Sequence, residues 1–264
     1  MNGDSSFFCY RDGVLVPVTD TDSPDVHLEA ADSWLVDEGR VRAIERHFAR
    51  FRNAVSTICP DQVEQLPDFY RAVTRGIPRT GRWFPRIEFH GKPSTANHLH
   101  LRLREAPEQL DTVTLWTLDE IDPRVNPSIK GPDLSLGQQL RRRANLHGAD
   151  EAVLVNEDGY VVEGALSSLV WWRDGVLCAP GDDVRWLPSV TRDIVFSIAS
   201  QANIPVREEL VKPEQLNGRE IWALSSLHGI RVVTAWDALP DGPAAPEHAD
   251  SFRRRLRMLL TALD

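Results

Sequence analysis

Lysine is rare in this sequence, which makes each lysine a candidate for chemistry. The 30 basic residues include only three lysines, Lys92, Lys130 and Lys212, and the others are arginines. Arginine does not replace lysine where an amine must lose its proton and attack a carbonyl carbon. Lys130 is the strongest candidate, because it lies in a connecting segment just before a helix, where a cleft is expected. A solvated loop lysine is the alternative interpretation.

A glutamate and a helix start could supply two further parts of a site. Glu163 ends a strand and precedes Gly164, so backbone can approach a ligand closely and the carboxylate could hold a protonated ring nitrogen. Residues 187–192 (LPSVTR) lead into a helix whose free N–H groups and dipole attract a dianion such as phosphate. Val190 and Thr191 stand at this start. The alternatives are an exposed strand-end carboxylate and simple N-capping by Thr191.

Two serines and one arginine complete the candidate set. Ser225 and Ser226 lie in a turn between two strands, where their hydroxyls could reach the same phosphate. Arg50 lies on an early helix, at the edge of its apolar stripe. An ordinary polar turn and a solvated helix face are the alternatives. His98 and His100 face the same side of a strand, but no third ligand with diagnostic spacing accompanies them, so no metal site is predicted.

The periodicity of apolar residues indicates which elements position these candidates. In the first part, strict alternation predicts strands and a spacing of three or four predicts helices. The expected strands cover residues 6–18 (as a hairpin), 33–36, 83–89, 98–104 and 112–118. The expected helices cover residues 44–58, ended by Pro60, and 61–75. This part is therefore expected to form a small α+β domain over residues 1–118.

A proline-rich segment, residues 119–129, is expected to link this domain to a second one. Residues 130–264 are expected to form a larger, β-rich domain with helices packed on it. Its expected helices cover residues 134–147, 191–203 and 251–263. Its expected strands cover residues 151–156, 161–163, 168–173, 175–178, 220–224 and 231–234. The chain is thus expected to be a two-domain α+β protein with a cleft at the domain junction.

Composition limits the class of protein. A chain of 264 residues with 42% hydrophobic and 26% charged residues is long enough for a real core and typical of a soluble globular protein. No apolar run reaches the roughly 18 residues of a membrane helix, and the start lacks the layout of a secretory signal. The formal net charge of -9 argues against nucleic-acid binding. Three cysteines without paired spacing suit a cytoplasmic protein.

The order and spacing of the candidates resemble the class IV aminotransferase family. An arginine on an early helix is followed by a lysine after the linker, an EG pair, an LPxxTR stretch and a Ser-Ser turn before GIRVV. The resemblance spans roughly residues 39–234 and is strongest in residues 129–164. This family holds pyridoxal-phosphate (PLP) enzymes of fold type IV, namely branched-chain and D-amino-acid aminotransferases and aminodeoxychorismate lyases.

The resemblance implies a role for each candidate. Lys130 corresponds to the catalytic lysine that binds PLP covalently and then moves a proton. Glu163 corresponds to the glutamate that pairs with the pyridinium nitrogen, which lets the ring act as an electron sink. Arg50, in the stretch HFARF, corresponds to the phosphate-binding arginine of the family's HxxRL stretch. The other implied phosphate-binding residues are Val190, Thr191, Ser225 and Ser226, of which the last two also contact substrate.

The resemblance implies a cofactor site at the interface of the two domains and the transfer of an amino group between an amino acid and a 2-oxo acid by a homodimer. Several family marks differ here: Ser168, Ser189 and Ser135 stand where Asn, Gly and Tyr are usual, and the segment AADSWLV lacks a following glutamate. The substrate side is therefore the less defined part. The candidate substrate residues are Arg102, Arg104 and Leu227. A PLP lyase that releases pyruvate and a non-catalytic relative of the fold are the alternatives.

Overall fold

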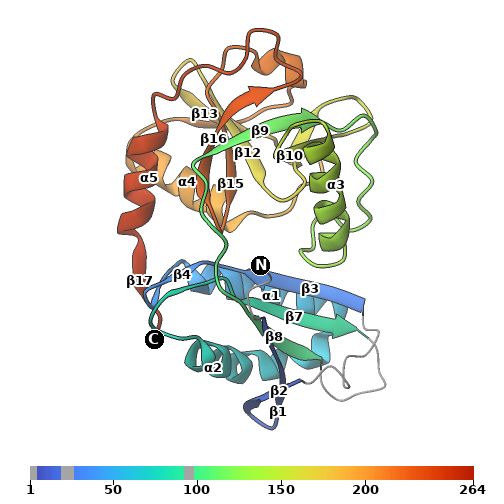
Figure 1. The fold of residues 1–264 in the computed structure, drawn as a ribbon, viewed down its shortest axis with the longest axis vertical. Coiled ribbons are helices and arrows are strands. Elements are labelled where there is room, and N and C mark those ends of the chain that lie inside the picture. The colour runs from blue at the N-terminus through green and yellow to red at the C-terminus, as the bar shows by residue number, and fades with distance from the viewer. Residues whose placement is uncertain (1–4, 19–26, 92–97) are drawn as a thin grey trace. The chain divides into compact units, whose positions relative to one another are not determined.

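The computed structural model describes residues 5–18, 27–91 and 98–264, so Lys92 lies outside the described residues (Figure 1). The chain divides into two compact units. The first unit consists of Met1–Glu108, Ile129–Pro132 and Leu259–Asp264, and the second of Gln109–Ser128 and Asp133–Met258. Three segments differ from the expected boundaries, because strand pairing and backbone contacts tie them to other parts of the chain. The second unit includes residues 109–118, and the first unit includes residues 129–132 and 259–264.

The main sheet of the first unit has five strands in the order β2-β1-β8-β7-β3. All of its pairings are antiparallel. The strands are β1 (Ser6–Arg11), β2 (Val14–Pro17), β3 (His27–Ser33), β7 (Arg86–Gly91) and β8 (Leu99–Leu103). The expected β1-β2 hairpin is confirmed, and it turns at Asp12 and Gly13, both at positive φ, as an Asp-Gly hairpin requires.

A smaller sheet of the first unit has the order β17-β5-β4-β6. Its strands are β4 (Val36–Asp37), β5 (Arg40–Arg42), β6 (Arg82–Trp83) and β17 (Leu260–Ala262). The expected helix over residues 251–263 is wrong at its end. The helix stops at Met258, and Leu260–Ala262 pair with β5 instead, which satisfies their backbone groups in a ladder.

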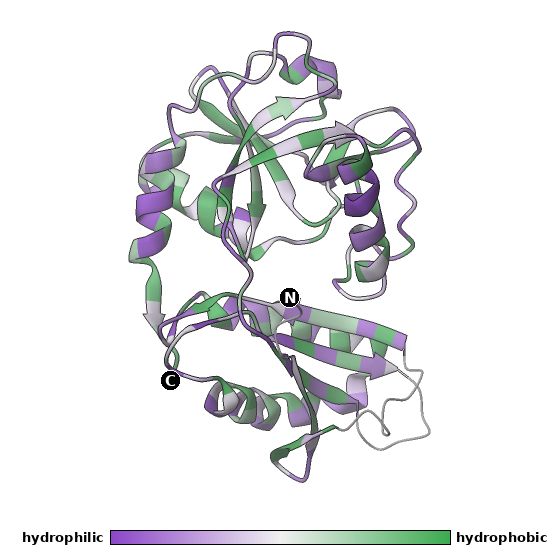
Figure 2. Cartoon of the chain, viewed as in Figure 1, coloured by the Kyte–Doolittle hydropathy of each residue, from purple (hydrophilic) through white to green (hydrophobic). Residues whose placement is uncertain are grey.

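Two helices complete the first unit. The helix α1 (Ile44–Ile58) has the expected bounds, and its buried stripe packs on β3. The second expected helix is shorter: a 3-10 turn, η2 (Pro60–Gln65), precedes α2 (Leu66–Gly76). Pro67 lies in the first turn of α2, where its missing N–H costs no helical hydrogen bond. Hydrophobic and hydrophilic positions alternate along α2 in Figure 2, as the sequence predicts for a half-buried helix.

The second unit contains an eight-stranded sheet in the order β11-β10-β9-β16-β15-β12-β13-β14. Its strands are β9 (Thr112–Thr117), β10 (Glu151–Val155), β11 (Val161–Gly164), β12 (Ser168–Arg173), β13 (Val176–Ala179), β14 (Val206–Glu208), β15 (Ile221–Ser225) and β16 (Gly229–Trp236). Strand β9 pairs in parallel with β10 and β16, so it does not belong to the first sheet as expected. Alternation along one strand does not identify its partners, which explains the error.

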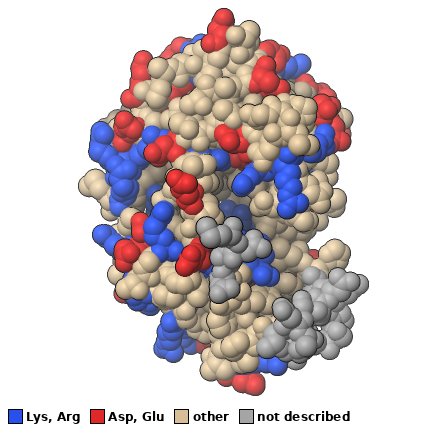
Figure 3. All heavy atoms as spheres, viewed as in Figure 1, with Lys and Arg blue, Asp and Glu red and all other residues tan. Residues whose placement is uncertain are grey.

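Helices cover parts of this sheet. They are α3 (Leu134–Leu146), which contacts β10, α4 (Val190–Gln201), which contacts β14 and β15, and α5 (Ala249–Met258), which contacts β16, while η3 (Pro213–Leu216) is a short 3-10 turn. Arg255 and Arg257 lie in the last turn of α5, near the negative end of its dipole, and Figure 3 shows basic side chains where Figure 1 places this helix. No helix among the described residues is long and apolar enough to cross a membrane.

Candidate active site

The candidate residues fall into two groups, one in each unit. Arg50, Arg102, Arg104 and Lys130 belong to the first unit, and Glu163, Val190, Thr191, Ser225, Ser226 and Leu227 to the second. Each group sits in a network of buried polar side chains, and each network contains an acidic residue that the sequence analysis did not select.

In the first unit, Arg50 is held by a buried carboxylate. Arg50 donates from Nε to Oδ2 of Asp32 at 2.7 Å and from Nη2 to Oδ1 at 2.8 Å, a forked contact between α1 and β3. Asp32 is fully buried, and the N–H of Ser33 donates to the same Oδ1 at 2.8 Å. The direction of the Arg50 guanidinium is therefore set by Asp32. In the sequence, the feature that points to this role of Asp32 is a charged residue within the mostly apolar segment AADSWLV.

His47 completes this cluster from the preceding turn of α1, which places it on the same helix face as Arg50. Its Nδ1 lies 2.7 Å from Oδ1 of Asp32. Burial raises the pKa of Asp32, but Arg50 and His47 outweigh this effect and hold that pKa well below its ordinary value. Because an ionised carboxylate only accepts hydrogen bonds, Nδ1 of His47 carries the proton. Burial lowers the pKa of His47, and the charges of Arg50 and Lys130 lower it further against the opposing effect of Asp32.

Lys130 is placed close to this cluster by its backbone. Its carbonyl accepts a hydrogen bond of 2.6 Å from the N–H of Ala31, the residue before Asp32. The next residue, Gly131, has a φ of 150°, and a Cβ there would lie 2.8 Å from Cα of Ala30. Only glycine allows the segment to run this close to β3. Lys130 and Arg50 therefore lie in the same unit, with Asp32 and His47 around them.

A second charged cluster lies on β7 and β8. Glu88 is 1% exposed, and Nε of Arg86 and Nε of Arg102 donate to its Oε1 at 2.7 and 2.9 Å. His90 contacts the other oxygen at 2.7 Å. Nε of Arg104 donates to the carbonyl of Phe84 at 3.0 Å. Arg102 and Arg104 thus share one sheet face with Arg86, and the charged Glu88 between apolar neighbours in RIEF was the overlooked signal.

The surplus of positive charge in this cluster affects Arg104. Burial, together with the nearby Arg86 and Arg102, lowers the pKa of Arg104 to about 10. His98 and His100 make ring and backbone contacts there: Nδ1 of His98 lies 2.8 Å from the carbonyl of His90, and His100 stacks on Phe7 at 5.0 Å. No group of three or more His, Cys, Asp or Glu residues among those described could hold a metal ion.

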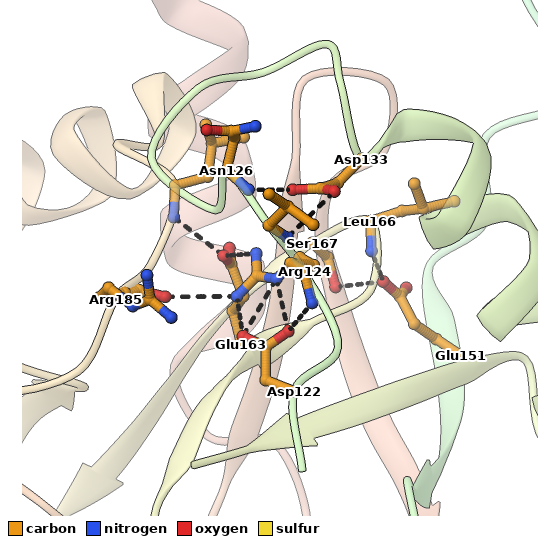
Figure 4. Close-up of polar contacts among 11 residues, drawn as sticks. Asp122, Arg124, Asn126, Asp133, Glu151, Glu163, Leu166, Ser167 and Arg185 are labelled. Carbon is orange, nitrogen blue, oxygen red and sulfur yellow. Dashed lines mark hydrogen bonds and ion pairs between the residues drawn. The ribbon is translucent and has the colours of Figure 1, made fainter. Parts of the chain in front are cut away.

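In the second unit, Glu163 is 4% exposed and is the next-to-last residue of β11 (Figure 4). Its Oε1 forms an ion pair with Nη1 of Arg124 and accepts a hydrogen bond of 2.9 Å from the N–H of Leu187. Burial raises the pKa of Glu163, and these two contacts oppose the rise. Glu163 is therefore a buried carboxylate held by donors on one oxygen, not an exposed strand end.

The turn after Glu163 is fixed by Glu151 on β10. Oε1 of Glu151 accepts hydrogen bonds of 2.8 Å from the N–H of Leu166 and from Oγ of Ser167, and Oε2 pairs with Arg231 (Figure 4). A Cβ at Gly164 would lie 2.6 Å from Oγ of Ser167. The EGALS stretch therefore needs a glycine next to Glu163 for this turn to close.

The start of α4 leaves polar groups for a ligand. Ser189 is the N-cap, and its Oγ accepts from the N–H of Arg192 at 3.2 Å. The alternative interpretation, in which Thr191 caps its own helix, is therefore wrong, because Ser189 is the cap. Thr191 is buried, and its hydroxyl makes no hydrogen bond with the described residues. Val190 and Thr191 lie in the first turn, where backbone N–H groups have no helical partner.

The Ser225–Ser226 turn joins β15 to β16 and is tied to the segment before β9. Oγ of Ser225 accepts from the N–H of His228 at 3.2 Å. The carbonyl of Leu227 accepts from Nε2 of Gln109 at 2.5 Å, and Nδ1 of His228 accepts from the N–H of Leu110 at 3.0 Å. Burial, with the charges of Arg231 and Arg141, lowers the pKa of His228 to about 4, consistent with Nδ1 as an acceptor.

The family model for amino-transferase class IV matches residues 29–236, most of the chain. The chain belongs to the class IV aminotransferases. The chain is 33% identical over 109 residues to the branched-chain-amino-acid aminotransferase of Escherichia coli K12. That match covers 38% of this chain and 34% of the relative. A putative branched-chain-amino-acid aminotransferase of Methanocaldococcus jannaschii is 34% identical over 193 residues, 65% of each chain. The chain thus spans about a third of the length of the first relatives it matches.

Comparison with solved structures shows that the chain has the expected fold. A hypothetical aminotransferase from Mycobacterium tuberculosis, in a PLP-bound form, superposes with a TM-score of 0.77 at 18% identity, over 97% of this chain and 98% of that chain. A fold IV transaminase from Curtobacterium pusillum gives 0.72 at 18% identity, over 97% and 99%. The expected α+β architecture of fold type IV is therefore confirmed.

Proposed function

We propose that this class IV aminotransferase uses PLP to move an amino group between an amino acid and a 2-oxo acid. The family match supports the proposal, because residues 29–236 include every proposed catalytic and cofactor residue. The placement of Lys130 carries it: the backbone of this rare lysine is anchored on β3, next in space to the strand segment that holds a buried carboxylate and its fixed arginine. The relatives in Escherichia coli and Methanocaldococcus jannaschii are themselves named as aminotransferases.

The described residues fit the chemical groups of PLP. Oε2 of Glu163 accepts no hydrogen bond from the described residues, so it suits a protonated ring nitrogen. The start of α4, the Thr191 hydroxyl and the Ser226 hydroxyl suit a phosphate dianion. The Arg50 guanidinium adds the positive charge that such a group needs. The full set proposed to hold the cofactor is Arg50, Lys130, Glu163, Val190, Thr191, Ser225 and Ser226.

Each side chain then has a defined task. Bound PLP supplies an electron sink for the charge that develops when the substrate loses its α-proton. Lys130 would hold the aldehyde group of the cofactor, and its Nζ, as a free amine, would accept the α-proton of the substrate and later give it back. Glu163 keeps the ring nitrogen protonated. Arg50, which is held by Asp32, would neutralise part of the negative charge of the phosphate group.

For the substrate, we propose that Arg102 and Arg104 bind a carboxylate and that Leu227 contacts the substrate next to the serine turn. Three arginines surround a single glutamate, Glu88, on this sheet face. The cluster therefore has positive charge left to neutralise a bound anion. The names of the relatives favour amino transfer over the lyase reaction. The homodimer and the cytoplasmic location stay predictions.

Covalent attachment of the cofactor tests the proposal. The purified protein, loaded with PLP, is expected to show a visible absorption band that borohydride removes, leaving the cofactor on the peptide that contains Lys130. Lys130→Ala is expected to lack both the band and the labelled peptide, whereas Lys212→Arg keeps them. A wild-type protein without the band, or a label on another peptide, would contradict the proposal.

Substrate turnover separates the two reactions. Without a 2-oxo acid acceptor, an aminotransferase stops after one half-reaction, whereas a lyase continues to turn over. We expect the loaded enzyme to convert about one equivalent of amino acid and then stop until a 2-oxo acid is added. Continued release of pyruvate without an acceptor would favour the lyase.

A further inference from the structure

Arg124 is a buried arginine that the proposed reaction has not used. It lies in the segment between β9 and α3, and its side chain is only 8% exposed. It donates from Nε to Oδ1 of Asp122 at 2.9 Å and from Nη2 to Oδ2 at 2.7 Å. Its Nη2 also lies 3.3 Å from the carbonyl of Arg185, and its Nη1 pairs with Glu163 (Figure 4). All three nitrogens of the guanidinium are therefore engaged.

Asp122 determines where Arg124 points. A guanidinium is planar and rigid, so the forked contact with Asp122 fixes the direction of the remaining nitrogen, Nη1. Nη1 faces Glu163 as a result. Asp122 is only two residues from Arg124 in the chain, so this contact forms locally. The pair Asp122–Arg124 thus presents a fixed donor to the carboxylate on β11.

The contacts of Glu163 are asymmetric. Both of its donors, Nη1 of Arg124 and the N–H of Leu187, reach Oε1. Within the described parts of the chain, no donor reaches Oε2. Because Oε1 is pinned from two elements, the carboxylate plane is fixed and Oε2 has a fixed direction. Leu187 begins the LPSVTR stretch, so the same oxygen also ties Glu163 to the segment that leads into α4.

We propose that Arg124 is a positioning residue for Glu163: it pins Oε1 and so reserves Oε2 for the ring nitrogen of PLP. This inference rests on the proposed function of Glu163. Arg124 also opposes the effect of burial, which by itself raises the pKa of this carboxyl group. An ionised, correctly turned carboxylate is what a protonated ring nitrogen needs. Arg124 therefore acts on the cofactor only through Glu163.

A double-mutant cycle tests this dependence, because residues that act through one another are not additive. The variants are Arg124→Gln, Glu163→Gln and both together, with Arg143→Gln as the matched control. Arg143 pairs with Asp119 and Glu120 at the surface of the same unit. The readouts are the dissociation constant of PLP from titration of the apoprotein, kcat against KM, and the melting temperature of the apoprotein.

Arg124→Gln is expected to lower kcat about 100-fold, as misplacing a catalytic group does. It is also expected to raise the dissociation constant of PLP about tenfold, which corresponds to the loss of one charge-assisted hydrogen bond. In the Glu163→Gln background the same change is expected to alter both quantities less than about twofold. Arg143→Gln leaves them unchanged. Asp122→Asn weakens the contact that orients the Arg124 guanidinium but keeps the arginine. If Arg124→Gln fails to fold, Asp122→Asn takes its place in the cycle, and smaller effects are expected.

Equal effects of Arg124→Gln with and without Glu163 would overturn the inference, as would a lower apoprotein melting temperature with unchanged PLP affinity and kcat. The borohydride label on wild-type Lys130 separates this failure from failure of the proposed function. A labelled wild type with an additive cycle overturns only the role of Arg124. An unlabelled wild type overturns both.

Discussion

Asp32 and Arg50 form a forked ion pair that links β3 to α1, with Nε–Oδ2 and Nη2–Oδ1 distances of 2.7 and 2.8 Å. The carboxylate is fully buried and also accepts a hydrogen bond from Nδ1 of His47. A buried carboxylate with two side-chain donors is an orienting device, because its hydrogen bonds fix both partners. In this family member it fixes the arginine proposed to bind phosphate.

Asp32→Asn should therefore affect both folding and cofactor binding. Loss of one partner from a buried ion pair costs about 3–5 kcal/mol of the free energy of unfolding. We also expect weaker PLP binding, because Arg50 loses its orientation. Denaturant unfolding and PLP titration measure the two effects. Asp68→Asn is the control, since its exposed pair with Arg71 is worth about 0–1 kcal/mol. Equal stability of the two variants would contradict the role assigned to Asp32.

Gly131 should be required for the placement of Lys130. A Cβ there would lie 2.8 Å from Cα of Ala30, and its φ of 150° disfavours other residues. Backbone strain alone costs about 1–3 kcal/mol. Because Gly131→Ala adds a close contact with β3, it is expected to lower the free energy of unfolding by more than this strain. It is also expected to slow the PLP and borohydride labelling of Lys130. Gly148→Ala is the matched control, because it has a φ of 73° but no atom within 4 Å of the added Cβ. Similar losses in both variants would show that the contact with β3 is unimportant.

Glu88 should make stability depend on pH in the acid range. Although burial raises its pKa, the hydrogen bond with His90 and the charges of Arg86 and Arg102 hold it at about 2, below its ordinary value of 4.5. A lowered folded-state pKa stabilises the fold above the unfolded-state pKa, and this contribution is lost as the pH falls from about 4.5 towards about 2. In the wild type the melting temperature should fall as the pH is lowered through that window. In Glu88→Gln it should fall less steeply. The exposed Glu64→Gln variant is the control. If the slope of melting temperature against pH in Glu88→Gln equalled that of the wild type and of Glu64→Gln, the role of Glu88 would be contradicted.

Local signals in the sequence predicted elements better than their partners. The helix α1 has the expected bounds because its apolar spacing and Pro60 are local features. Strand β9 was expected in the wrong sheet, because its parallel neighbours β10 and β16 lie far away in the sequence. Strand β17 was expected as helix, because the apolar run after α5 fits both periodicities until its pairing with β5 is known.

The same limit applies to the site. Lys130, Glu163 and Arg50 were selected as candidates through residue type and order along the chain. Asp32 and Arg124 were not, because each acts through a partner on another element: Asp32 reaches across to α1, and Arg124 reaches across to β11. Composition and spacing show which groups could react, whereas the residues that orient them emerge only from the folded chain.

Arg104 should contribute to substrate binding more than to turnover. Its Nε donates to the carbonyl of Phe84, and two neighbouring arginines add positive charge that the single Glu88 does not fully balance. Arg104→Gln is expected to raise KM for an amino acid substrate about tenfold, in the range of one hydrogen bond to a charged group, with little change in kcat. Steady-state kinetics with Arg219→Gln, at an exposed pair with Asp174, as control measures this. A fall in kcat at constant KM would exclude a binding role.

Thr191 and Ser189 should separate cofactor binding from helix stability at the start of α4. The Ser189 hydroxyl caps the helix, so Ser189→Ala should cost about 1 kcal/mol of the free energy of unfolding. The Thr191 hydroxyl has no hydrogen bond among the described residues, so Thr191→Val should leave the apoprotein's melting temperature unchanged. It should instead weaken PLP binding about tenfold, since one hydrogen bond to a phosphate oxygen is lost. If Thr191→Val lowered the melting temperature and left PLP affinity intact, the hydroxyl would serve the fold, and the phosphate would have to be held by other groups.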